Sequence, residues 1–354
     1  MSAERDKITT MPFVKHEKIF GFPTVSLAHT PTPVEYLKNF SNWLNGPDIF
    51  IKRDDCTGLA LGGNKARQLE FYLGDALSRD ADAIVITGAV QSNFVRQAAA
   101  AARKTNMGIH IQLEHRVKGE DKLYMQSGNV LLNKLFGANI HFFKGGSDES
   151  DADTGLDLIA EKVREKGGSP YVIHLGLKYL PLGALGYVQA ALEIIKQSNE
   201  LNMQFDAILL GSGSAATHSG LLTGLRANSS FVTVYGICVR RSAEQQMSRV
   251  VKRVRQVESM LNIKKTVLNE EVVVDDSWLG KGYGYVTEES DEALKCLAQT
   301  EGILLDPVYT AKVMAGLIGL VRQGVFHKGQ RILFLHTGGT PALFGYTDIL
   351  ETVD

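Results

Sequence analysis

The chain of 354 residues is predicted to fold as an α/β protein with two lobes, each built on a parallel-rich sheet covered by helices on both faces. Three observations predict this class. Strand patterns alternate with helix patterns along most of the chain, the strands are apolar almost throughout, and the length exceeds that of a usual single domain. Ligands of such sheets bind at the carboxyl ends of the strands.

The first lobe follows a wrapping segment, residues 1–47, in which prolines leave helical spacing only within 34–44. An extended run from Ile51 and a loop of small residues lead to an amphipathic helix that starts at Lys65. The alternation then predicts strands and helices in turn, at 83–88, 91–104, 108–114, 121–136, 139–145, 155–166 and 170–176.

The same rhythm continues in the second lobe. Helices are predicted at 183–197, from about 215, at 242–262 and at 287–301. Strands are predicted at 205–211, 231–239, 271–276 and 331–339. A further apolar run ends at Leu305 and is interpreted as another strand end.

Composition excludes several classes of function. A net charge of −1 provides no general attraction for nucleic acid or acidic lipid, and the basic residues between 240 and 255 are typical of a solvated helix face. The three cysteines form no CxxC pair, so neither a metal site nor a disulfide is expected, and a cytoplasmic location fits best. No apolar run predicts a signal peptide or a membrane span.

Lys65 stands where strand gives way to helix, directly after Gly62-Gly63-Asn64. Glycines allow the backbone to approach a ligand, and the amides of a helix N-terminus favour an anion over an ammonium group. The position suits a reactive amine, although a lone lysine here can also be a solvated residue of the first turn.

Two further strand–helix junctions carry polar groups. The Gly/Ser-rich run 211–217 follows an apolar strand, so its amides and hydroxyls can converge on a phosphate, although it lacks the GK[ST] of a nucleotide loop. Gln91-Ser92-Asn93 can hold a carboxylate. The alternatives are a tight turn of small residues and an ordinary helix N-cap.

Hydroxyl groups follow two later apolar runs. His336-Thr337-Gly338-Gly339 ends the last strong strand, and the 305–310 run brings Tyr309 and Thr310, while Tyr283 lies between two glycines. Aromatic residues of the core or of turns are the alternative. Because lysine, anion loop, carboxylate site and phenols all fall at strand–helix junctions, they are expected to share one active site.

The runs IKRDD…GGNKxRxLEF, QSN, GSGSAATHSG, LLDPVYT and HTGGTPALF resemble the family of D-cysteine desulfhydrases and 1-aminocyclopropane-1-carboxylate deaminases, which includes L-cysteate sulfo-lyases. These are pyridoxal-phosphate enzymes of the tryptophan-synthase-β fold, also called fold type II. The resemblance covers nearly the whole chain. It implies a large cofactor-binding lobe of residues 1–64 and 180–354, a smaller inserted lobe of residues 65–179, and a homodimer.

The resemblance also implies individual roles. Lys65 would bond to the cofactor aldehyde and shuttle the proton. Asn93 would bind the ring 3'-oxygen, and Tyr283 and Tyr309 would lie around the substrate. Ser92 with its neighbouring amides would receive the substrate carboxylate or help proton transfer, and Gln91 would also contact the substrate. The phosphate would be held by Gly211, Ser212, Gly213, Ser214, Ala215, Ala216 and Thr217.

Two threonines bear on the substrate. The deaminases carry a glutamate and a leucine where this chain has Thr310 and Thr337, so the resemblance is to the desulfhydrases. A hydroxyl near the pyridine nitrogen tolerates a neutral ring, and this still supports loss of a good β leaving group but disfavours cyclopropane opening.

The chain departs from the family pattern at two places. Phe94 replaces the histidine of SNH, and residues 177–182 replace a short turn. Within that segment Lys178 could bind an anionic side chain such as a sulfonate, or could be a solvated loop residue.

The predicted function is therefore α,β-elimination from a small amino acid with a β-sulfur group, giving pyruvate, ammonia and sulfide or sulfite. Two alternatives remain open. One is the deamination of aminocyclopropane carboxylate, and the other is a non-catalytic protein that binds a metabolite on the same scaffold.

Overall fold

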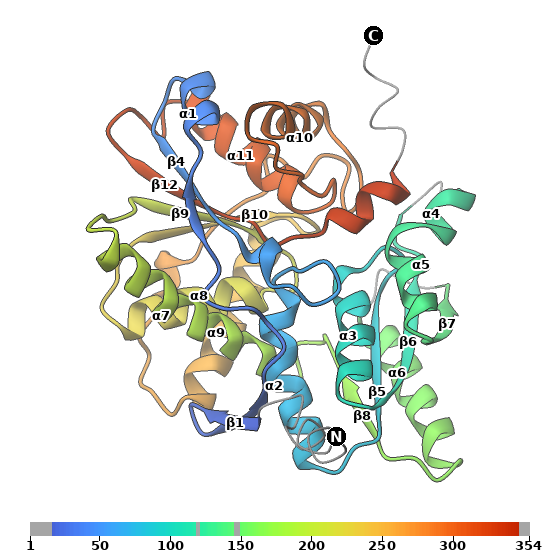
Figure 1. The fold of residues 1–354 in the computed structure, drawn as a ribbon. Helices are drawn as coiled ribbons and strands as arrows, with labels where there is room; N and C mark the ends of the chain where they lie inside the picture. Colours follow the sequence, from blue (N-terminus) through green and yellow to red (C-terminus); the bar gives the residue numbers. More distant parts are fainter. Residues whose placement is uncertain (1–15, 118–120, 145–148, 347–354) are drawn as a thin grey trace, which may run out of the picture.

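The computed structural model describes residues 16–117, 121–144 and 149–346, and it places two sheets side by side with helix α2 (Lys65–Ser78) between them (Figure 1). The larger sheet draws its strands from both ends of the chain, and the smaller one lies wholly within residues 83–173. The α/β class with parallel-rich sheets is confirmed. The predicted lobe boundaries at 64 and 180 stay a prediction, although the two sheets fall on either side of them.

The larger sheet has six strands, and the carboxyl ends of its parallel strands lie at one edge. Only the pairing of β3 with β4 is antiparallel. In spatial order the strands are β11 (Val273–Asp275), β10 (Thr233–Cys238), β9 (Ala207–Ser212), β12 (Arg331–Leu335), β4 (Asp48–Lys52) and β3 (Val34–Tyr36).

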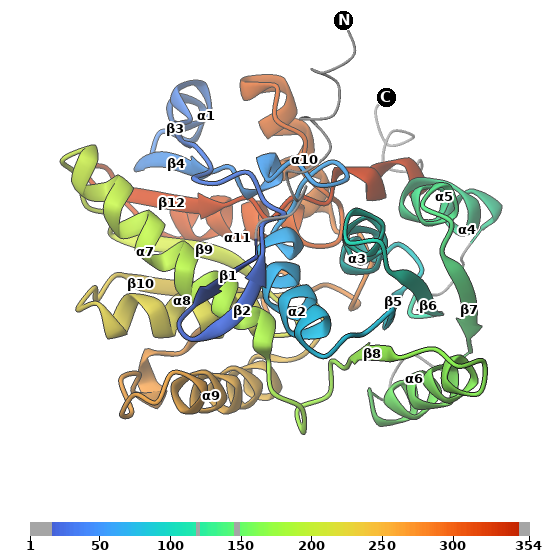
Figure 2. The same ribbon diagram turned by 60° about the horizontal axis from the view of Figure 1, so that its bottom comes forward.

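Helices cover both faces of this sheet (Figure 2). One buried apolar cluster joins the sheet to three helices, namely α1 (Lys38–Leu44), α10 (Glu288–Glu301) and α11 (Thr310–Arg322). A second cluster joins its other face to α7 (Leu185–Glu200), α8 (Ala216–Ala227) and α9 (Ala243–Met260). Burial on both faces explains why the strands are apolar throughout rather than alternating.

The smaller sheet is entirely parallel, in the order β7 (Asn139–Phe143), β6 (Gly108–Glu114), β5 (Ala83–Ala89) and β8 (Pro170–Ile173). One face packs on α2 and on α3 (Asn93–Lys104), α4 (Lys122–Gln126) and α5 (Gly128–Leu135). The other face packs on α6 (Glu149–Arg164).

The remaining elements are short. A two-stranded antiparallel sheet, β1 (His16–Ile19) and β2 (Phe22–Val25), packs on α2. The described residues also form short 3₁₀-helices: η1 (Asp54–Cys56), η2 (Leu182–Ala184) and η3 (Asn269–Glu271), each one turn long, and the longer η4 (Thr340–Gly345). In the part of the chain that the structure describes, no helix is long and apolar enough to cross a membrane.

Three secondary-structure predictions need correction. The helical spacing in 34–44 yields strand β3 followed by α1, and the helix predicted near 121–136 is divided at Ser127 into α4 and α5. The apolar run that ends at Leu305 is not a strand, because it forms no pairing and leads instead into α11, a helix that the sequence analysis missed.

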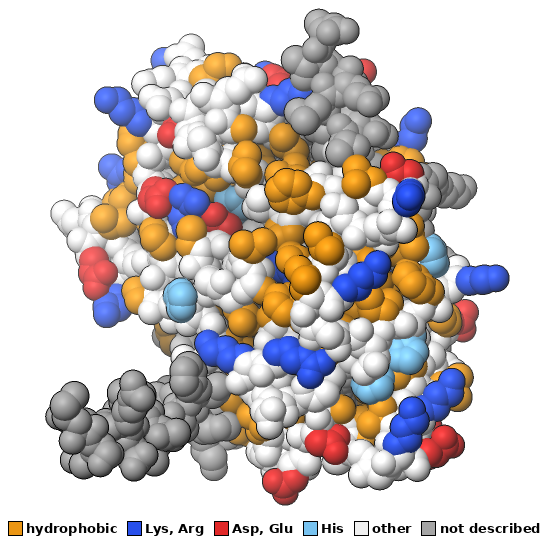
Figure 3. Space-filling view, turned by 45° about the vertical axis from the view of Figure 1, so that its right-hand side comes forward, with side chains coloured by type: hydrophobic (Ala, Val, Ile, Leu, Met, Phe, Trp, Pro, Cys, Tyr) orange, Lys and Arg blue, Asp and Glu red, His pale blue; other side chains and the backbone are white. Residues whose placement is uncertain are grey.

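Figure 3 shows the side of the molecule on which α4, α5 and β7 lie, and hydrophobic side chains gather across the upper and central part of this face. Large apolar side chains with substantial exposure occur in all three elements: Leu123, Leu131, Leu135 and Phe142.

Candidate active site

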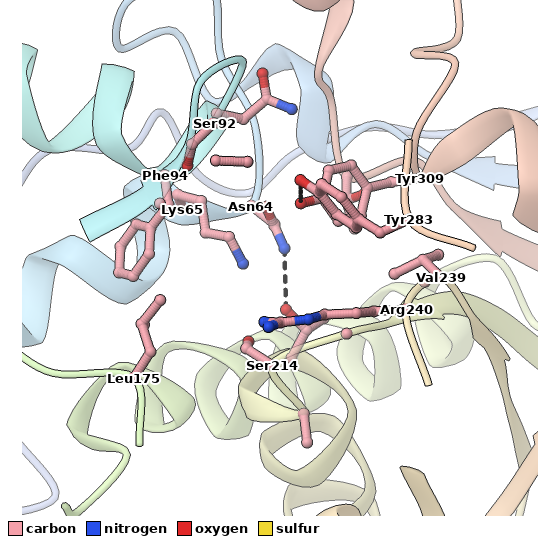
Figure 4. Close-up of a pocket in the computed structure, with 18 of the residues that line it drawn as sticks. Asn64, Lys65, Ser92, Phe94, Leu175, Ser214, Val239, Arg240, Tyr283 and Tyr309 are labelled. Atoms are coloured by element: carbon pink, nitrogen blue, oxygen red, sulfur yellow. Dashed lines mark hydrogen bonds between the residues drawn. The ribbon is translucent and has the colours of Figure 1, made fainter. Parts of the chain in front are cut away.

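A pocket lies where the carboxyl ends of the two sheets meet (Figure 4). The smaller lobe contributes the residues that follow β5 and β6, and the larger lobe contributes those that follow β9, β10 and β12. The pocket is lined by Asn64, Lys65, Thr87, Gly88, Ala89, Ser92, Asn93, Phe94, Arg116, Leu175, Gly211, Gly213, Ser214, Ala215, Thr217, His218, Val239, Arg240, Tyr283, Tyr309, Thr337 and Gly338.

The loop before Lys65 is tightly wound. Ala60, Leu61, Gly62 and Gly63 all have positive φ, and a Cβ on Gly62 would lie 1.7 Å from the carbonyl oxygen of Asp55. Two glycines are therefore required here. Helix α2 begins at Lys65, as the sequence predicted.

The Lys65 side chain points into the pocket from the first turn of α2 (Figure 4). Its amine lies 5.4 Å from the centre of the Phe94 ring. The residue is partly open to the cavity, but protein surrounds the amine, and this burial lowers the pKa of Lys65 to about 8. A useful fraction of the side chain is then the neutral, nucleophilic amine at mildly alkaline pH.

The loop at 211–217 forms an anion site at the N-terminus of α8. Ala215 adopts the left-handed conformation, with φ of 74°, directly before the helix begins at Ala216. The Thr217 hydroxyl oxygen accepts hydrogen bonds from Asn64 Nδ2 and Gln68 Nε2, each at 2.9 Å, and the first of these is drawn in Figure 4. Its own proton is left for an acceptor in the pocket, so the site favours an anion.

Two residues of this loop do not face the pocket. Ser212 is buried, and its hydroxyl bonds Gln246 Nε2 at 2.8 Å and His218 Nδ1 at 3.2 Å. Ala216 is likewise outside the lining. The predicted phosphate contact is thereby narrowed to Gly211, Gly213, Ser214, Ala215 and Thr217.

Asn93 presents a defined edge of its amide to the pocket. Its Oδ1 accepts hydrogen bonds from Arg96 Nη1 at 3.1 Å and from Asn129 Nδ2 at 3.0 Å, both within the protein. The Nδ2 group is therefore the edge left for a ligand, and it requires an acceptor there. An oxygen such as the 3'-oxygen of the cofactor meets that requirement.

Ser92 and Gln91 differ in what they can reach. Ser92 caps α3 by accepting from Val95 N at 3.3 Å, and it lines the pocket with a hydroxyl proton to donate. The Gln91 side chain lies outside the lining and is used internally, since Nε2 donates to Tyr124 O at 2.5 Å and Oε1 accepts from Asn129 N at 2.9 Å. The structure gives Gln91 a supporting place rather than the predicted contact with substrate.

Tyr283 and Tyr309 meet at the pocket wall, with their phenol oxygens 2.7 Å apart (Figure 4). Burial raises the pKa of both phenols, so both are protonated at neutral pH. One phenol must donate to the other, which leaves a single proton for a third group. Lys312 holds the loop of Tyr283 in place by donating to the Leu279 and Gly282 carbonyls at 2.7 and 2.9 Å.

The two threonines of the sequence prediction have different surroundings. Thr337 lines the pocket, but Thr310 is fully buried outside it, and its hydroxyl lies 2.7 Å from Asp306 Oδ1. Asp306 also accepts from the backbone amides of 308–310, which fixes the start of α11 and with it Tyr309. Thr310 thus acts on the pocket through Asp306 and Tyr309, and it does not reach a ligand itself.

Lys178 lies away from the pocket. It is exposed on the surface, with its amine 4.8 Å from the centre of the Tyr179 ring, and it is not part of the lining. The structure therefore supports the alternative of a solvated loop lysine rather than a substrate-binding one.

The prediction that the basic residues between 240 and 255 form a solvated helix face is wrong for Arg249 and Arg253. Arg249 and Arg253 are only 5% and 4% exposed, and both donate to the Leu175 carbonyl at 2.9 Å. Arg249 also donates to Ser214 O at 3.1 Å. Arg249 thus joins α9 to the loop 211–217, and both arginines join α9 to Leu175, which lines the pocket.

Two arginines of the lining, Arg116 and Arg240, escaped the sequence analysis as site residues. Arg116 lies two residues after the end of β6, and Arg240 lies two residues after the end of β10. A position just beyond the carboxyl end of a parallel strand is the sequence feature that could have identified both as site residues. The lining contains no aspartate or glutamate among the residues that the structure describes. Among these residues, no cluster of three or more histidine, cysteine, aspartate or glutamate side chains could hold a metal ion.

The donor set fits pyridoxal phosphate. A buried amine suits its aldehyde, a helix N-terminus with a hydroxyl proton suits its phosphate, and the Asn93 amide edge suits its 3'-oxygen. All three belong to one pocket.

Comparison with known proteins agrees with this geometry. A family model described as "Pyridoxal-phosphate dependent enzyme" matches residues 25–338. A D-cysteine desulfhydrase of Klebsiella pneumoniae is 42% identical over 330 residues, covering 93% of this chain and 98% of that protein. A D-cysteine desulfhydrase of Salmonella typhi is 41% identical over 325 residues, covering 92% and 96%.

Two solved structures are also similar to this chain. A crystal structure of an "ACC deaminase homologue" superposes with a TM-score of 0.83 at 36% identity, covering 93% of this chain and 96% of that one. An O-ureido-L-serine synthase superposes with a TM-score of 0.64 at 16% identity, which indicates a shared fold, and covers 93% and 94%.

Proposed function

This chain belongs to the pyridoxal-phosphate dependent enzyme family, and from that premise we propose that it is a carbon–sulfur lyase. The reaction is α,β-elimination from a small amino acid with a β-sulfur substituent, and the products are pyruvate, ammonia and sulfide or sulfite. Its cofactor is pyridoxal 5'-phosphate. The observation that carries the proposal is the buried Lys65 amine, which shares one pocket with the anion loop 211–217 and the Asn93 amide.

The cofactor, when bound, withdraws electrons from the substrate α-carbon, which makes the α-proton acidic and a β substituent able to leave. The proton transfers and the positioning of the substrate are carried out by side chains of this protein. The Lys65 amine is the base for the α-proton, because burial has brought its pKa to about 8, close to the working range of a general base.

The substrate is positioned from two sides. The Ser92 hydroxyl and the amides at the start of α3 are suited to the α-carboxylate, since a helix N-terminus stabilises negative charge. The single proton left over by the Tyr283–Tyr309 pair is suited to the departing sulfur group. Phe94 closes the pocket beside Lys65 and keeps water from the amine.

Cyclopropane opening is the second candidate, because one structural relative is called an ACC deaminase homologue. The lining argues against it. A strong electron sink needs an acid to keep the pyridine nitrogen protonated, and no carboxylate lines the pocket among the described residues. Loss of sulfide or sulfite, both good leaving groups, requires less of the ring.

The experiment is an absorbance spectrum of the purified, cofactor-loaded protein during addition of D-cysteine, L-cysteine, cysteate and aminocyclopropane carboxylate. Pyruvate, 2-oxobutyrate, sulfide and sulfite are assayed in parallel. Pyruvate together with sulfide or sulfite would support the lyase. 2-Oxobutyrate would instead identify the deaminase, and a protein that takes up no cofactor would favour a metabolite-binding role.

We also propose that the chain works as a homodimer in the cytoplasm. Support comes from the exposed apolar side chains of α4, α5 and β7 and from three cysteines that are all free. Sedimentation equilibrium tests the dimer, and a monomer at micromolar concentration would contradict it.

A further inference from the structure

Arg96 of helix α3 is a fully buried cation that forms no ion pair with any residue that the structure describes. Its Nη1 donates to Asn93 Oδ1 and to Asn129 Oδ1, each at 3.1 Å, and its Nη2 donates to the Gly62 carbonyl at 2.7 Å. All three acceptors are neutral oxygens. Burying a charge beside neutral groups alone is costly, and burial lowers the pKa of Arg96 to about 10.

Asp306 is the acid whose charge opposes this shift, but it is not a partner of Arg96. Its carboxylate accepts hydrogen bonds from the backbone amides of 308–310 and from the Thr310 hydroxyl. Burial raises the pKa of Asp306, and those same amides and hydroxyl, rather than a cation, chiefly oppose the rise. Arg96 therefore lacks an ionic partner within the described part of the chain.

Arg96 determines which edge of the Asn93 amide is available to a ligand. A guanidinium group only donates hydrogen bonds, so the amide atom that meets it must be the oxygen, Oδ1. The Nδ2 group of Asn93 is then left for an acceptor in the pocket, which Asn93 lines. An oxygen bound by that Nδ2 group lies on the far side of the amide from a positive charge.

Arg96 also holds the loop that carries Lys65. The Gly62 carbonyl accepts hydrogen bonds from Arg96 Nη2 and from Gln97 Nε2. Gly62 precedes Lys65 by three residues and has a positive φ of 67°. One buried cation thus supports both residues that are expected to reach the cofactor ring, Asn93 directly and Lys65 through its loop.

We propose that Arg96 is a positioning residue that keeps the 3'-oxygen of the bound cofactor ionised. It acts through Asn93, whose amide it directs toward that oxygen, and the oxyanion balances its charge. This rests on the proposed function and deepens it. It identifies a group that compensates for the lack of any carboxylate among the described residues of the pocket lining.

An ionised 3'-oxygen is useful because it lies next to the carbon to which an amine bonds. Its negative charge favours a positive charge on the nitrogen of that amine, which draws electrons away from the substrate α-carbon. The α-proton can then be lost although no acid in the described lining keeps the pyridine nitrogen protonated. Only protons change place, so no oxidant or reductant is required.

The test uses 4'-deoxypyridoxine 5'-phosphate, which keeps the phosphate and the 3'-oxygen but has no aldehyde to react with Lys65. A second ligand carries hydrogen in place of the 3'-oxygen. Calorimetric titration of the full-length, cofactor-free protein gives the dissociation constant of each ligand. The absorbance of the bound first ligand, recorded from about pH 5 to about pH 10, gives the pH at which its 3'-oxygen ionises.

Variants Arg96→Gln and Arg96→Lys are compared with the wild type and with Arg164→Gln, a control that removes an exposed arginine of α6 outside the pocket. The other ionisable side chains of the pocket are the same in all four proteins, and ligand absorbance reports the 3'-oxygen itself rather than their titration. They are Lys65, Arg116, His218, Arg240, Tyr283 and Tyr309.

The wild type is expected to bind the first ligand at least about tenfold more tightly than the second, and to hold it ionised at neutral pH. Arg96→Gln should weaken binding of the first ligand about tenfold to a hundredfold and raise its ionisation by about one to two pH units, because a nearby positive charge is lost.

The variants also separate charge from structure. Binding of the second ligand should change by less than about threefold in Arg96→Gln, since it needs the folded pocket but not the charge. Arg96→Lys should keep the ionisation within about half a pH unit of the wild type, because the charge remains while the fork is lost. Arg164→Gln should match the wild type in every respect.

Two results would overturn the inference. One is equal affinity and equal ionisation of the first ligand in Arg96→Gln and the wild type. The other is an Arg96→Gln variant that loses both ligands to the same extent, which would give Arg96 a structural role alone. Neither result bears on the lyase reaction, which these ligands cannot undergo. A wild type that binds neither ligand would instead contradict the cofactor site on which both proposals rest.

Discussion

Two clusters of buried charge lie on opposite sides of helix α2, and they are built differently. On one side Lys52 and Arg67 meet Asp54 and Glu193 in a closed network, in which each cation has a carboxylate partner. On the other side, two residues away along the helix, Lys65 lines a pocket together with Arg116 and Arg240. Arg116 is paired with Glu114 behind the lining, but no acidic group acts on the Lys65 amine.

The closed network stabilises the fold. Asp54 is fully buried and accepts from Arg67 Nε and Nη2, each at 3.0 Å, from Thr32 Oγ1 at 2.7 Å and from Tyr187 Oη at 2.6 Å. Burial alone would raise the pKa of Asp54, but Arg67, Lys52 and the Tyr187 hydroxyl together outweigh it and hold the pKa below its ordinary value. Charged groups whose ionic partners all belong to the protein itself stabilise its fold.

The open cluster has the opposite property. Burial lowers the pKa of Lys65 to about 8, and no acidic group opposes the shift. A buried, reactive amine that the chain leaves without an acidic partner is typical of a functional site, and we propose that Lys65 reacts there with the cofactor. Both clusters are buried, so burial alone does not identify the candidate active site. The buried amine that lacks an acidic partner does.

The largest expected effect is at Lys65. Lys65→Met should abolish turnover and the absorbance band that arises when the lysine amine bonds to the cofactor, while leaving the fold intact. In the cofactor-free protein the folded pKa of about 8 lies below the ordinary 10.5, so stability rises with pH between these values, where the unfolded chain binds the extra proton. The variant should lack this rise and be about 3 kcal/mol more stable at pH 7, measured by urea unfolding.

Asp54 should show the reverse. Asp54→Asn leaves Arg67 and Lys52 with too few carboxylates in a buried place, and it should lower the free energy of unfolding by about 3–5 kcal/mol. The wild type should lose this stability as pH falls below the ordinary carboxyl range toward the depressed pKa of Asp54. Denaturant titrations at several pH values test both points, and turnover per folded molecule should remain. A variant as stable as the wild type would remove the contrast between the clusters.

The next effect concerns a residue that supports the cofactor without touching it. Asn129→Asp removes one of the two groups that donate to Asn93 Oδ1, so the Asn93 amide is held only by Arg96 and its edge toward the pocket is less firmly fixed. Cofactor affinity should fall about tenfold, the value of one hydrogen bond. Fluorescence titration of the cofactor-free protein measures it, with Asn139→Asp, an exposed position, as the matched control. Equal affinity in Asn129→Asp and the wild type would show that Asn93 does not depend on this support.

The smallest effect is expected at Lys178. Because its side chain is exposed and lies outside the pocket lining, Lys178→Ala should change stability by less than about 0.5 kcal/mol and leave KM for every substrate unchanged. Steady-state kinetics on cysteine and cysteate test this. A selective rise in KM for cysteate would return Lys178 to the substrate site.

The sequence could predict those parts of the site that form contiguous motifs. Lys65 after two glycines, the anion loop before α8 and Asn93 after β5 each lie at the start of a helix, and all three line the pocket. Such local runs signal both their conformation and their chemistry.

The sequence could not predict contacts between residues that are far apart in the chain. Arg116 and Arg240 lie on different lobes, and only the packing of the lobes brings both to one tyrosine. Helix α11 was missed because residues 310–320 are buried all round, which removes the polar face that reveals an amphipathic helix. Gln91 is predicted to contact the substrate because it is next to Ser92 and Asn93 in the sequence. Its side-chain amide instead forms hydrogen bonds with the backbone of Tyr124 and Asn129.

The most direct test of the central claim is the absorbance spectrum of the wild type beside Lys65→Met, each incubated with pyridoxal phosphate, freed of excess and then mixed with D-cysteine, L-cysteine or cysteate. A cofactor band that shifts on mixing in the wild type, with pyruvate formed, and neither band nor pyruvate in Lys65→Met, is the predicted result. An equal band and equal pyruvate in both proteins would contradict the assignment of the open cluster as the catalytic centre.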